Sequence, residues 1–391
     1  MPDIPAIQSE LRTSKIDAWL FCDILHRDPL AYRILGLDHG MAKRRWFYLI
    51  PAKGEPRKLV HSIEAGMLDG LPGSKQQYLG LGELEKGLGK LLAKTKTVAM
   101  QYSPRNNIPY VSTVDAGMVE LVRGFKKKVV SSANLVQIFE ARWSAEQLES
   151  HLEAGRIVDS ITRDAFSRAG ALVRERKALT EYELQQWMTK QFRAHQIVAD
   201  SGPIVAVGAH SGNPHYEPSA DSPAPIREGD LLLLDVWGKL QKPGSVYYDI
   251  TWTGYLGSAV PEKYAKMFDV VKHARDAAVN FVKEAVASGR KIHGWEVDNV
   301  CRAVIRKAGH AKHFMHRTGH SIGQEVHGNG ANMDGLEMKD DRAIVPRTCF
   351  SVEPGIYLPE FGVRSEVNVY VSERDARVTG EVQDAIIPIL A

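Results

Sequence analysis

The chain has 391 residues, of which 44% are hydrophobic and 25% are charged, and its formal net charge is +3 at neutral pH. This length is too great for one small core and predicts two domains. The small net charge gives no electrostatic reason to expect nucleic acid or a membrane surface as a partner. The lysine run at 126–128 is expected to be a solvated turn or strand edge.

The cysteines and the apolar runs indicate the compartment and the kinds of site to expect. Cys22, Cys301 and Cys349 lie far apart and form no CxxC pair, which excludes a disulfide framework and a cysteine-rich zinc site. Residues 1–12 lack the basic and apolar regions of a signal peptide. No apolar run approaches the ~18 residues that a transmembrane helix needs. We therefore expect a cytoplasmic protein.

Residues 1–135 are expected to form an α/β domain. Short apolar runs at 18–22 and 46–50 predict buried strands, a turn at 51–56 leads to a returning strand at 59–61, and a further strand at 97–100 follows a helix near 83–93. Gly80 and Gly82 resemble part of a nucleotide-binding motif. Position 85 is glutamate, however, and no acidic residue stands where that motif needs one, so we interpret the glycines as a loop.

A second domain is predicted over residues 144–391. Ser144 and Thr180 each open a capping box, which predicts helices to about residues 174 and 195. Strands at 204–207 and 231–236 follow. Helices at 261–286 and 294–307 and strands at 350–353 and 367–370 then repeat this order. The repeat predicts two related halves, with helices covering one face of the sheet and a site between the halves.

Acidic residues interrupt apolar strand segments in this second domain. Asp235 follows four leucines, Asp249 lies in the next predicted strand, and Glu353 and Glu366 belong to the later strand segments. Burying each of these carboxylates without a partner would cost several kcal/mol. Either basic side chains or metal ions must therefore neutralise them.

A histidine motif lies between the two acidic pairs. His316, His320 and His327 are spaced by four and seven residues around Gly319 and Gly323, which indicates close approach to a ligand. Residues 324–327 do not complete HExxH, which excludes a zincin helix. One histidine with four carboxylates favours a pair of Mn²⁺, Co²⁺ or Zn²⁺ ions. Such a pair would turn a bridging water into hydroxide and polarise the carbonyl that it attacks.

These motifs together resemble a known family. The segments LLLLDVW, YYDITWT, HRTGHSIG, SVEPGIY and GVRSEVNVYV, with Asp, Asp, His, Glu and Glu in that order, resemble the Xaa-Pro peptidases of the pita-bread metallopeptidase family M24. The resemblance covers residues 144–388, and the N-terminal domain resembles a creatinase-type domain. It implies an α/β (α+β) fold and hydrolysis of Xaa-Pro bonds with two divalent ions, of which Mn²⁺ is expected first. It also implies a homodimer and a small peptide substrate with proline at the second position.

The resemblance assigns metal ligands residue by residue. Asp249 and Glu366 would bridge the two metals, Asp235 would complete one site, and His320 and Glu353 would complete the other. Glu353 would also accept a proton from water and pass it to the leaving nitrogen.

The resemblance also assigns residues that contact the substrate. His215 would contact the peptide, and His327 would stabilise the oxyanion. His316 and Arg364 would face the proline side, where Arg364 would also brace Glu366.

The chain departs from the family pattern at several positions. Asp235 and Asp249 lie 14 residues apart, which is longer than usual and predicts a longer hairpin. A loop at 328–335 replaces the usual Glu and Pro after the last histidine. Trp252 stands where arginine is common, and Ser321 stands where glycine is common. These departures leave the metal ligands intact and affect the shape of the pocket.

Several functions are compatible with this pattern. A dipeptidase (prolidase) is expected first, and it requires a wall that recognises both ends of a dipeptide. We predict that Asp38 and Arg45, in the loop 36–45, supply this wall. The alternative is an aminopeptidase P that acts on longer peptides. A metal-free binding protein or a creatinase-like hydrolase is disfavoured by the intact ligands, and a methionine aminopeptidase lacks the long N-terminal domain.

Overall fold

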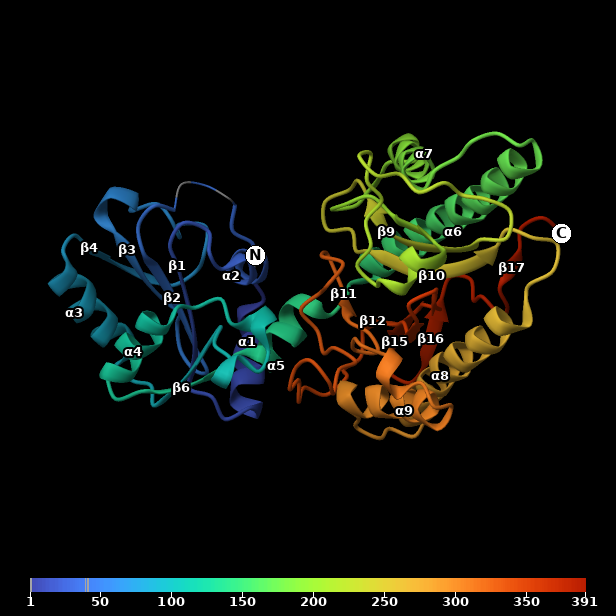
Figure 1. Ribbon diagram of the computed structural model, residues 1–391. Coiled ribbons are helices and arrows are strands. Elements are labelled where there is room, and N and C mark those ends of the chain that lie inside the picture. The colour runs from blue at the N-terminus through green and yellow to red at the C-terminus, as the bar shows by residue number, and fades with distance from the viewer. Residues whose placement is uncertain (1, 39, 41) are drawn as a thin grey trace. The chain divides into compact units, whose positions relative to one another are not determined.

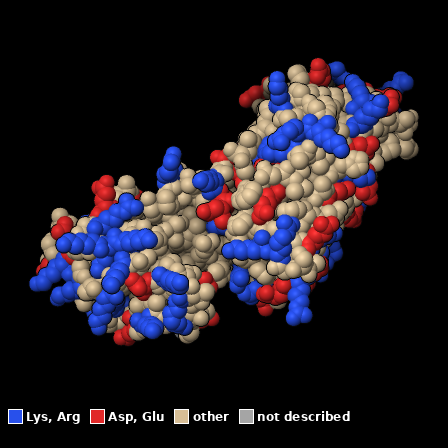
Figure 2. Space-filling model, turned by 90° about the horizontal axis from the view of Figure 1, so that it is seen from below, with Lys and Arg blue, Asp and Glu red and all other residues tan. Residues whose placement is uncertain are grey.

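The computed structural model describes residues 2–38, 40 and 42–391 and divides into two compact units, Met1–Glu140 and Ala141–Ala391 (Figure 1). Within this described part, no helix combines the length and apolarity needed to cross a membrane. Figure 2 shows acidic and basic side chains on the visible face of both units, with lysine and arginine prevailing on the N-terminal unit.

The N-terminal unit is built on a six-stranded mixed sheet with the strand order β4-β3-β2-β1-β5-β6. The central strands β1 and β2 are buried along their whole length, as their apolar runs predict. The elements are β1 (Ala18–Asp23), β2 (Trp46–Pro51), β3 (Arg57–His61), β4 (Ser74–Tyr78), β5 (Thr97–Met100), β6 (Lys128–Ser131), α1 (Ile4–Thr13), α2 (Pro29–Leu35), α3 (Leu81–Leu92), α4 (Ala116–Gly124) and α5 (Ala133–Val136).

One prediction for the N-terminal unit is wrong. Gly82 does not lie in a loop, because α3 begins at Leu81, whereas Gly80 precedes the helix as its N-cap with an extended backbone. Glycine is well tolerated at an N-cap position, so Gly80 is compatible with the start of a helix.

The first half of the C-terminal unit packs two helices on a sheet. Helices α6 (Ala145–Arg174) and α7 (Glu181–Ala194) begin with the predicted capping boxes at Ser144 and Thr180. The sheet order is β17-β10-β9-β7, with β8 also pairing with β9. These strands are β7 (Ile197–Val198), β8 (Ile204–Val207), β9 (Leu231–Leu240), β10 (Tyr248–Tyr255) and β17 (Ile387–Pro388).

The second half repeats this arrangement. Helices α8 (Glu262–Ala287) and α9 (Gly294–Lys307) precede a sheet of order β11-β12-β15-β16 and a β13–β14 hairpin. The strands are β11 (Ser321–Ile322), β12 (Thr348–Val352), β13 (Gly355–Tyr357), β14 (Gly362–Arg364), β15 (Val367–Val371) and β16 (Ala376–Thr379). Figure 1 shows α6 and α7 on one side of the unit and α8 and α9 on the other, with the strands between them. The predicted α/β class and duplicated order are therefore confirmed.

His151 on α6 joins the two halves of this unit. Its Nδ1 lies 2.6 Å from the carbonyl oxygen of Tyr247 and its Nε2 lies 2.7 Å from Oγ1 of Thr379 on β16. The carbonyl can only accept, so Nδ1 carries the proton and Nε2 accepts from the threonine. Complete burial lowers the pKa of His151 to about 4, which keeps the ring neutral near neutral pH.

Candidate active site

Two of the predicted ligands are positioned by regular strand pairing. In the antiparallel β9–β10 pair, Asp235 lies opposite Thr251 and Asp249 lies opposite Trp237. Side chains alternate between the faces of a sheet, so these four residues share one face. Asp249 is buried and Asp235 is half-buried on that face. The long strand β9 continues to Leu240, beyond the predicted end at residue 236.

The other three predicted ligands lie beside strand ends rather than within strands. His320 immediately precedes β11, Glu353 follows β12, and Glu366 precedes β15. Ser351 supports two of them, because its Oγ accepts a hydrogen bond of 2.9 Å from the backbone N–H of His320 and donates one of 3.1 Å to Oε1 of Glu353. The second half therefore positions its ligands through loops and side-chain hydrogen bonds.

The glycines of the histidine motif differ in how closely they pack. A Cβ atom at Gly319 would lie 1.9 Å from the carbonyl oxygen of Ser351, so this glycine permits close packing against β12. Gly323 has only van der Waals neighbours, the nearest being Gly328 at 3.7 Å. The structure therefore shows close approach of Gly319 to the chain itself, and close approach of this segment to a ligand stays a prediction.

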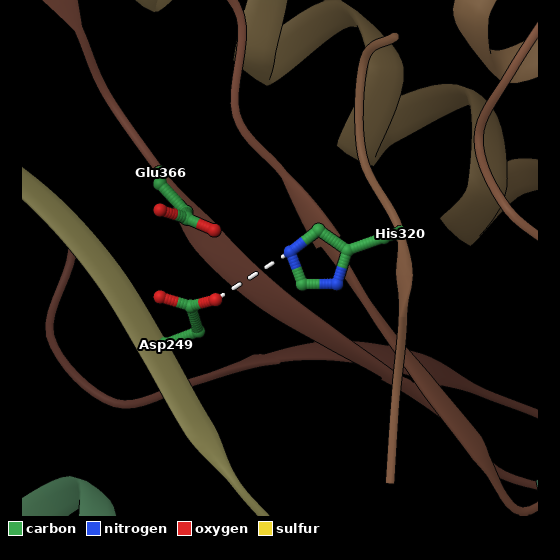
Figure 3. Close-up of side chains that lie close together, drawn as sticks. All are labelled: Asp249, His320 and Glu366. Carbon is green, nitrogen blue, oxygen red and sulfur yellow. Dashed lines mark ion pairs between the residues drawn. The ribbon is translucent and has the colours of Figure 1, made fainter. Parts of the chain in front are cut away.

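Three predicted ligands converge tightly. One potential ligand atom from each of Asp249, His320 and Glu366 lies within 4.8 Å of the other two. Figure 3 shows the three side chains pointing toward one another from separate segments. The His320 Nε2 atom is 3.5 Å from Oδ2 of Asp249 and 3.4 Å from Oε1 of Glu353.

The carboxylates of this cluster carry more negative charge than their protein neighbours compensate. Asp249 Oδ1 and Glu366 Oε1 are buried and have no hydrogen-bond partner in the described structure. Burial, and then the neighbouring carboxylates, raise the pKa of Asp249 and of Glu366. Burial also raises the pKa of Asp235, and raises that of Glu353 to about 7.

This donor set fits divalent cations. Partnerless buried carboxylate oxygens that repel one another are stabilised by a cation between them. Burial lowers the pKa of His320 well below its ordinary value, so the imidazole is neutral and one ring nitrogen is available as a ligand. Oxygen donors with one imidazole suit Mn²⁺, Co²⁺ or Zn²⁺.

Arg364 contacts a different carboxylate from the one predicted. Its guanidinium forms a close ion pair with Asp235, while Nε donates to Thr251 Oγ1 at 2.9 Å. The Thr251 hydroxyl in turn donates to Oε2 of Glu366 at 2.8 Å. The expected brace of Glu366 by Arg364 therefore runs through the Thr251 hydroxyl.

Two residues of this hydrogen-bond relay were not predicted from the sequence. Thr251 is two positions after Asp249 on β10, so strand alternation could have placed it on the site face. The hydroxyl of Tyr357 accepts from Arg364 Nη1 at 3.0 Å and lies 2.7 Å from His316 Nε2. No local pattern marks Tyr357, because its partners lie in distant segments.

The predicted substrate-contacting histidines differ in environment. Both ring nitrogens of His316 are engaged, by Tyr357 and by the Arg317 carbonyl oxygen at 2.7 Å, and burial lowers its pKa to about 3. The ring of His327 lies 4.3 Å from that of His320, and burial lowers its pKa to about 4. His215 is exposed, yet its charge lowers the pKa of Asp235 in small part, against the dominant effect of burial.

Asp38 and Arg45 belong to the N-terminal unit. Asp38 is exposed and Arg45 is half-buried. Positions 39 and 41 of the same predicted loop lie outside the described residues. The role of Asp38 and Arg45 in recognising a dipeptide stays a prediction.

A buried carboxylate on α9 anchors the histidine motif. Asp298 Oδ1 accepts hydrogen bonds from the Thr318 backbone at 2.9 Å and from its hydroxyl at 2.7 Å. Its Oδ2 accepts from Arg302 Nε at 2.7 Å and from Gly335 N–H at 3.0 Å. Asp298 is completely buried and therefore fixes the segment that precedes His320.

The loop 328–335 and Ser321, two departures from the family pattern, form one structure. Ser321 Oγ accepts from Gly330 N–H at 2.9 Å, and Ser321 N–H donates to Asn332 Oδ1 at 2.9 Å. The buried Arg342, paired with Asp340, donates to the carbonyl oxygen of Gly330 at 2.6 Å. A glycine at position 321 could not make the hydroxyl contact.

Comparisons with known proteins agree with this geometry. Residues 149–373, more than half of the chain, match metallopeptidase family M24. The chain is 31% identical over 215 residues to the Xaa-Pro dipeptidase of Lactobacillus delbrueckii subsp. lactis, covering 55% of this chain and 53% of that protein. The aligned region spans 66% of the length of two further curated relatives that it matches.

Solved structures share the fold over nearly the whole chain. Dipeptidase PepE from Mycobacterium ulcerans superposes with a TM-score of 0.75 at 22% identity, covering 98% of this chain and 96% of that one. X-Pro aminopeptidase from Thermotoga maritima superposes with a TM-score of 0.63 at 21% identity, covering 97% of this chain and 99% of that one.

Proposed function

The chain belongs to metallopeptidase family M24, and we propose that it hydrolyses the bond before proline in Xaa-Pro dipeptides with two divalent metal ions. The observation that carries the proposal is the buried cluster of Asp249, His320 and Glu366, in which two carboxylate oxygens have no partner. The Xaa-Pro dipeptidase named among its relatives supports the substrate class.

Five residues would hold the ions. Asp249 and Glu366 would bridge them, Asp235 would complete one site, and His320 and Glu353 would complete the other. When bound, the ions would polarise the scissile carbonyl and lower the pKa of a water molecule. Mn²⁺ is our first expectation, with Co²⁺ and Zn²⁺ as alternatives that the same donors accept.

Glu353 would move the proton. Its Oε1 receives a hydrogen bond from Ser351, which orients the carboxylate, and burial raises its pKa to about 7. An oriented carboxylate beside the reacting groups can accept a proton from water and return it to the proline nitrogen as the bond breaks. That nitrogen must be protonated to leave as an amine.

His327 and Arg364 would position the peptide. With its pKa lowered to about 4, His327 is neutral and can donate a ring N–H to the oxygen of the scissile carbonyl. Arg364 uses three N–H groups on Thr251, Tyr357 and Asp235, which leaves one N–H on each terminal nitrogen for the proline carboxylate. His215 and His316 would line the same pocket.

The main alternative is an aminopeptidase P, since a solved structure of that activity shares the fold. A metal-free binding protein or a creatinase-like hydrolase on the same fold has the least support, because the metal ligands are intact. A homodimer and a cytoplasmic location also remain predictions.

The test compares two substrates on one preparation. Purified protein is stripped with a chelator, reloaded with Mn²⁺, Co²⁺ or Zn²⁺, and assayed with Ala-Pro and with Ala-Pro-Ala. We expect metal-dependent hydrolysis of Ala-Pro with a clearly higher kcat/KM than for the tripeptide. Comparable rates would replace the dipeptidase with an aminopeptidase P, and hydrolysis that persists after complete removal of metal would reject the metal mechanism.

A further inference from the structure

The site face of β9 continues past the predicted ligands to an aromatic residue. Trp237 lies opposite Asp249 in the β9–β10 pair and shares the face of Asp235. Its indole Nε1 donates a hydrogen bond of 2.7 Å to Oδ1 of Asp200. Asp200 therefore lies one side chain away from Asp249, at the edge of the site.

The charge of Asp200 is fixed in place but not neutralised. The residue follows β7 and is exposed to solvent. In the part of the chain that the structure describes, no lysine, arginine or histidine forms an ion pair with it. The tryptophan N–H is uncharged, so it orients the carboxylate without cancelling its charge.

The charged groups that contact this face of β9 differ from one position to the next. Arg364 contacts Asp235 at one position, and Asp200 contacts Trp237 two residues further along the strand. Two residues along a strand span about 7 Å. A peptide with its carboxylate toward Arg364 would direct its first residue toward Trp237 and Asp200.

We propose that Asp200 is a specificity residue that binds a cationic side chain on the residue before proline, so that lysine and arginine are favoured there. The inference rests on the proposed function and names a substrate preference within it. The charge is expected to come from the side chain rather than from the α-ammonium group. The α-ammonium is held on the carbon next to the scissile carbonyl, whereas lysine carries its charge at the end of a four-carbon stem.

Trp237 would complete this subsite. The aliphatic stem of lysine or arginine packs well on an aromatic face while its charged end stays in contact with a polar partner. Trp237 is half-buried, which leaves part of the indole accessible. Asp200 would then receive the charged end at the outer edge of the same ring.

The experiment measures a ratio of kcat/KM values in the metal-loaded protein. Lys-Pro is compared with norleucine-Pro, which has the same stem without the ammonium group. Asp200→Asn keeps the size of the side chain and an oxygen for Trp237, and should lower this ratio about two- to fivefold, the effect of one exposed charge pair. Asp200→Lys should lower it further and raise the relative rate on Glu-Pro. Asp164→Asn, an exposed change on α6, is the matched control and should leave the ratio unchanged.

Salt gives a second readout that a merely structural role would not produce. The preference of the wild-type protein for Lys-Pro should shrink as ionic strength rises, while that of Asp200→Asn should stay flat. An unchanged ratio in Asp200→Asn would overturn the inference, whether both rates stay the same or fall equally. Those outcomes are distinct from failure of the proposed function, in which the wild-type protein would hydrolyse neither substrate.

Discussion

The two halves of the C-terminal unit hold their predicted ligands in different ways. In the first half, Asp235 and Asp249 lie inside the paired strands β9 and β10, and the strand register sets their positions. In the second half, His320, Glu353 and Glu366 lie just outside strands and depend on hydrogen bonds from other side chains. A duplicated fold can therefore position one site by two physical means.

This difference has an energetic consequence. A residue inside a strand keeps its place as long as the sheet is intact, because many backbone hydrogen bonds share the task. A residue on a loop moves when a single anchoring side chain is lost. Substitutions outside the predicted ligands should therefore displace the ligands of the second half more than those of the first.

Removing Asp249, a carboxylate that we propose to bridge the ions, should have the largest effect. Asp249→Asn should lower kcat/KM on Ala-Pro by about 10³-fold or more, because loss of bound metal removes several kcal/mol of transition-state stabilisation. Metal content by elemental analysis should fall in parallel. Asp164→Asn serves as the control, and full metal content with full activity in Asp249→Asn would contradict the ligand assignment.

The same substitution should raise the free energy of unfolding of the metal-free protein. Burial raises the pKa of Asp249 in the folded state, so the charged form is disfavoured there relative to the unfolded chain. Metal-free stability should consequently decline as pH rises above the ordinary aspartate range. Asparagine removes this contribution, and the chelated variant should unfold with about 1–4 kcal/mol more free energy than the chelated wild type at neutral pH.

The next largest effect comes from Asp298, which supports the ligands of the second half only. Asp298→Asn should weaken metal binding and kcat/KM by about 10- to 100-fold, the usual range for residues that orient ligands. Asp298 holds Thr318, and the change alters the segment before His320.

The matched control is a buried carboxylate in the first half. Asp159 accepts hydrogen bonds from the Tyr248 hydroxyl at 2.8 Å and from Glu381 N–H at 3.1 Å, behind the sheet. Asp159→Asn should cost about 1–3 kcal/mol of stability and leave metal affinity unchanged. Equal losses of metal affinity in the two variants would remove the proposed difference between the halves.

The pH dependence of stability tests the connection between the halves. With a folded pKa of about 4, His151 stays neutral when folded and gains a proton more easily when unfolded. The unfolded state therefore binds more protons between its ordinary pKa and about pH 4, and stability falls as pH falls through that window.

His151→Gln should reduce this loss of stability at acidic pH. Glutamine can donate to the Tyr247 carbonyl and accept from Thr379, but it does not titrate. Urea unfolding of chelated samples at pH 7 and pH 4.5 should show that the wild type loses up to about 3 kcal/mol more than the variant. Identical pH profiles would show that His151 does not contribute.

The same contrast explains how much could be predicted from the sequence. Strand alternation and capping boxes depend on neighbouring residues, so α6, α7, β8 and β10 were predictable, as was the shared face of Asp235 and Asp249. Asp298 contacts Thr318 across 20 positions of sequence, and Tyr357 contacts His316 across 41. Such side-chain contacts depend on the folded path of the loops, which no local pattern encodes.

The smallest predicted effect concerns the loop that follows the histidine motif. A Cβ atom at Gly330 would lie 2.5 Å from Ser321 Oγ, so Gly330→Ala should cost about 1–3 kcal/mol through overpacking. Ser321→Gly removes the obstructing hydroxyl. In the Ser321→Gly variant, Gly330→Ala should therefore lower the free energy of unfolding by less. The two changes should couple by about 1 kcal/mol in a double-mutant cycle of urea unfolding. If the two changes in unfolding free energy are additive, Ser321 and the loop are energetically independent. The Ser321 hydroxyl would then not anchor the loop in the second half, although it accepts a hydrogen bond from it.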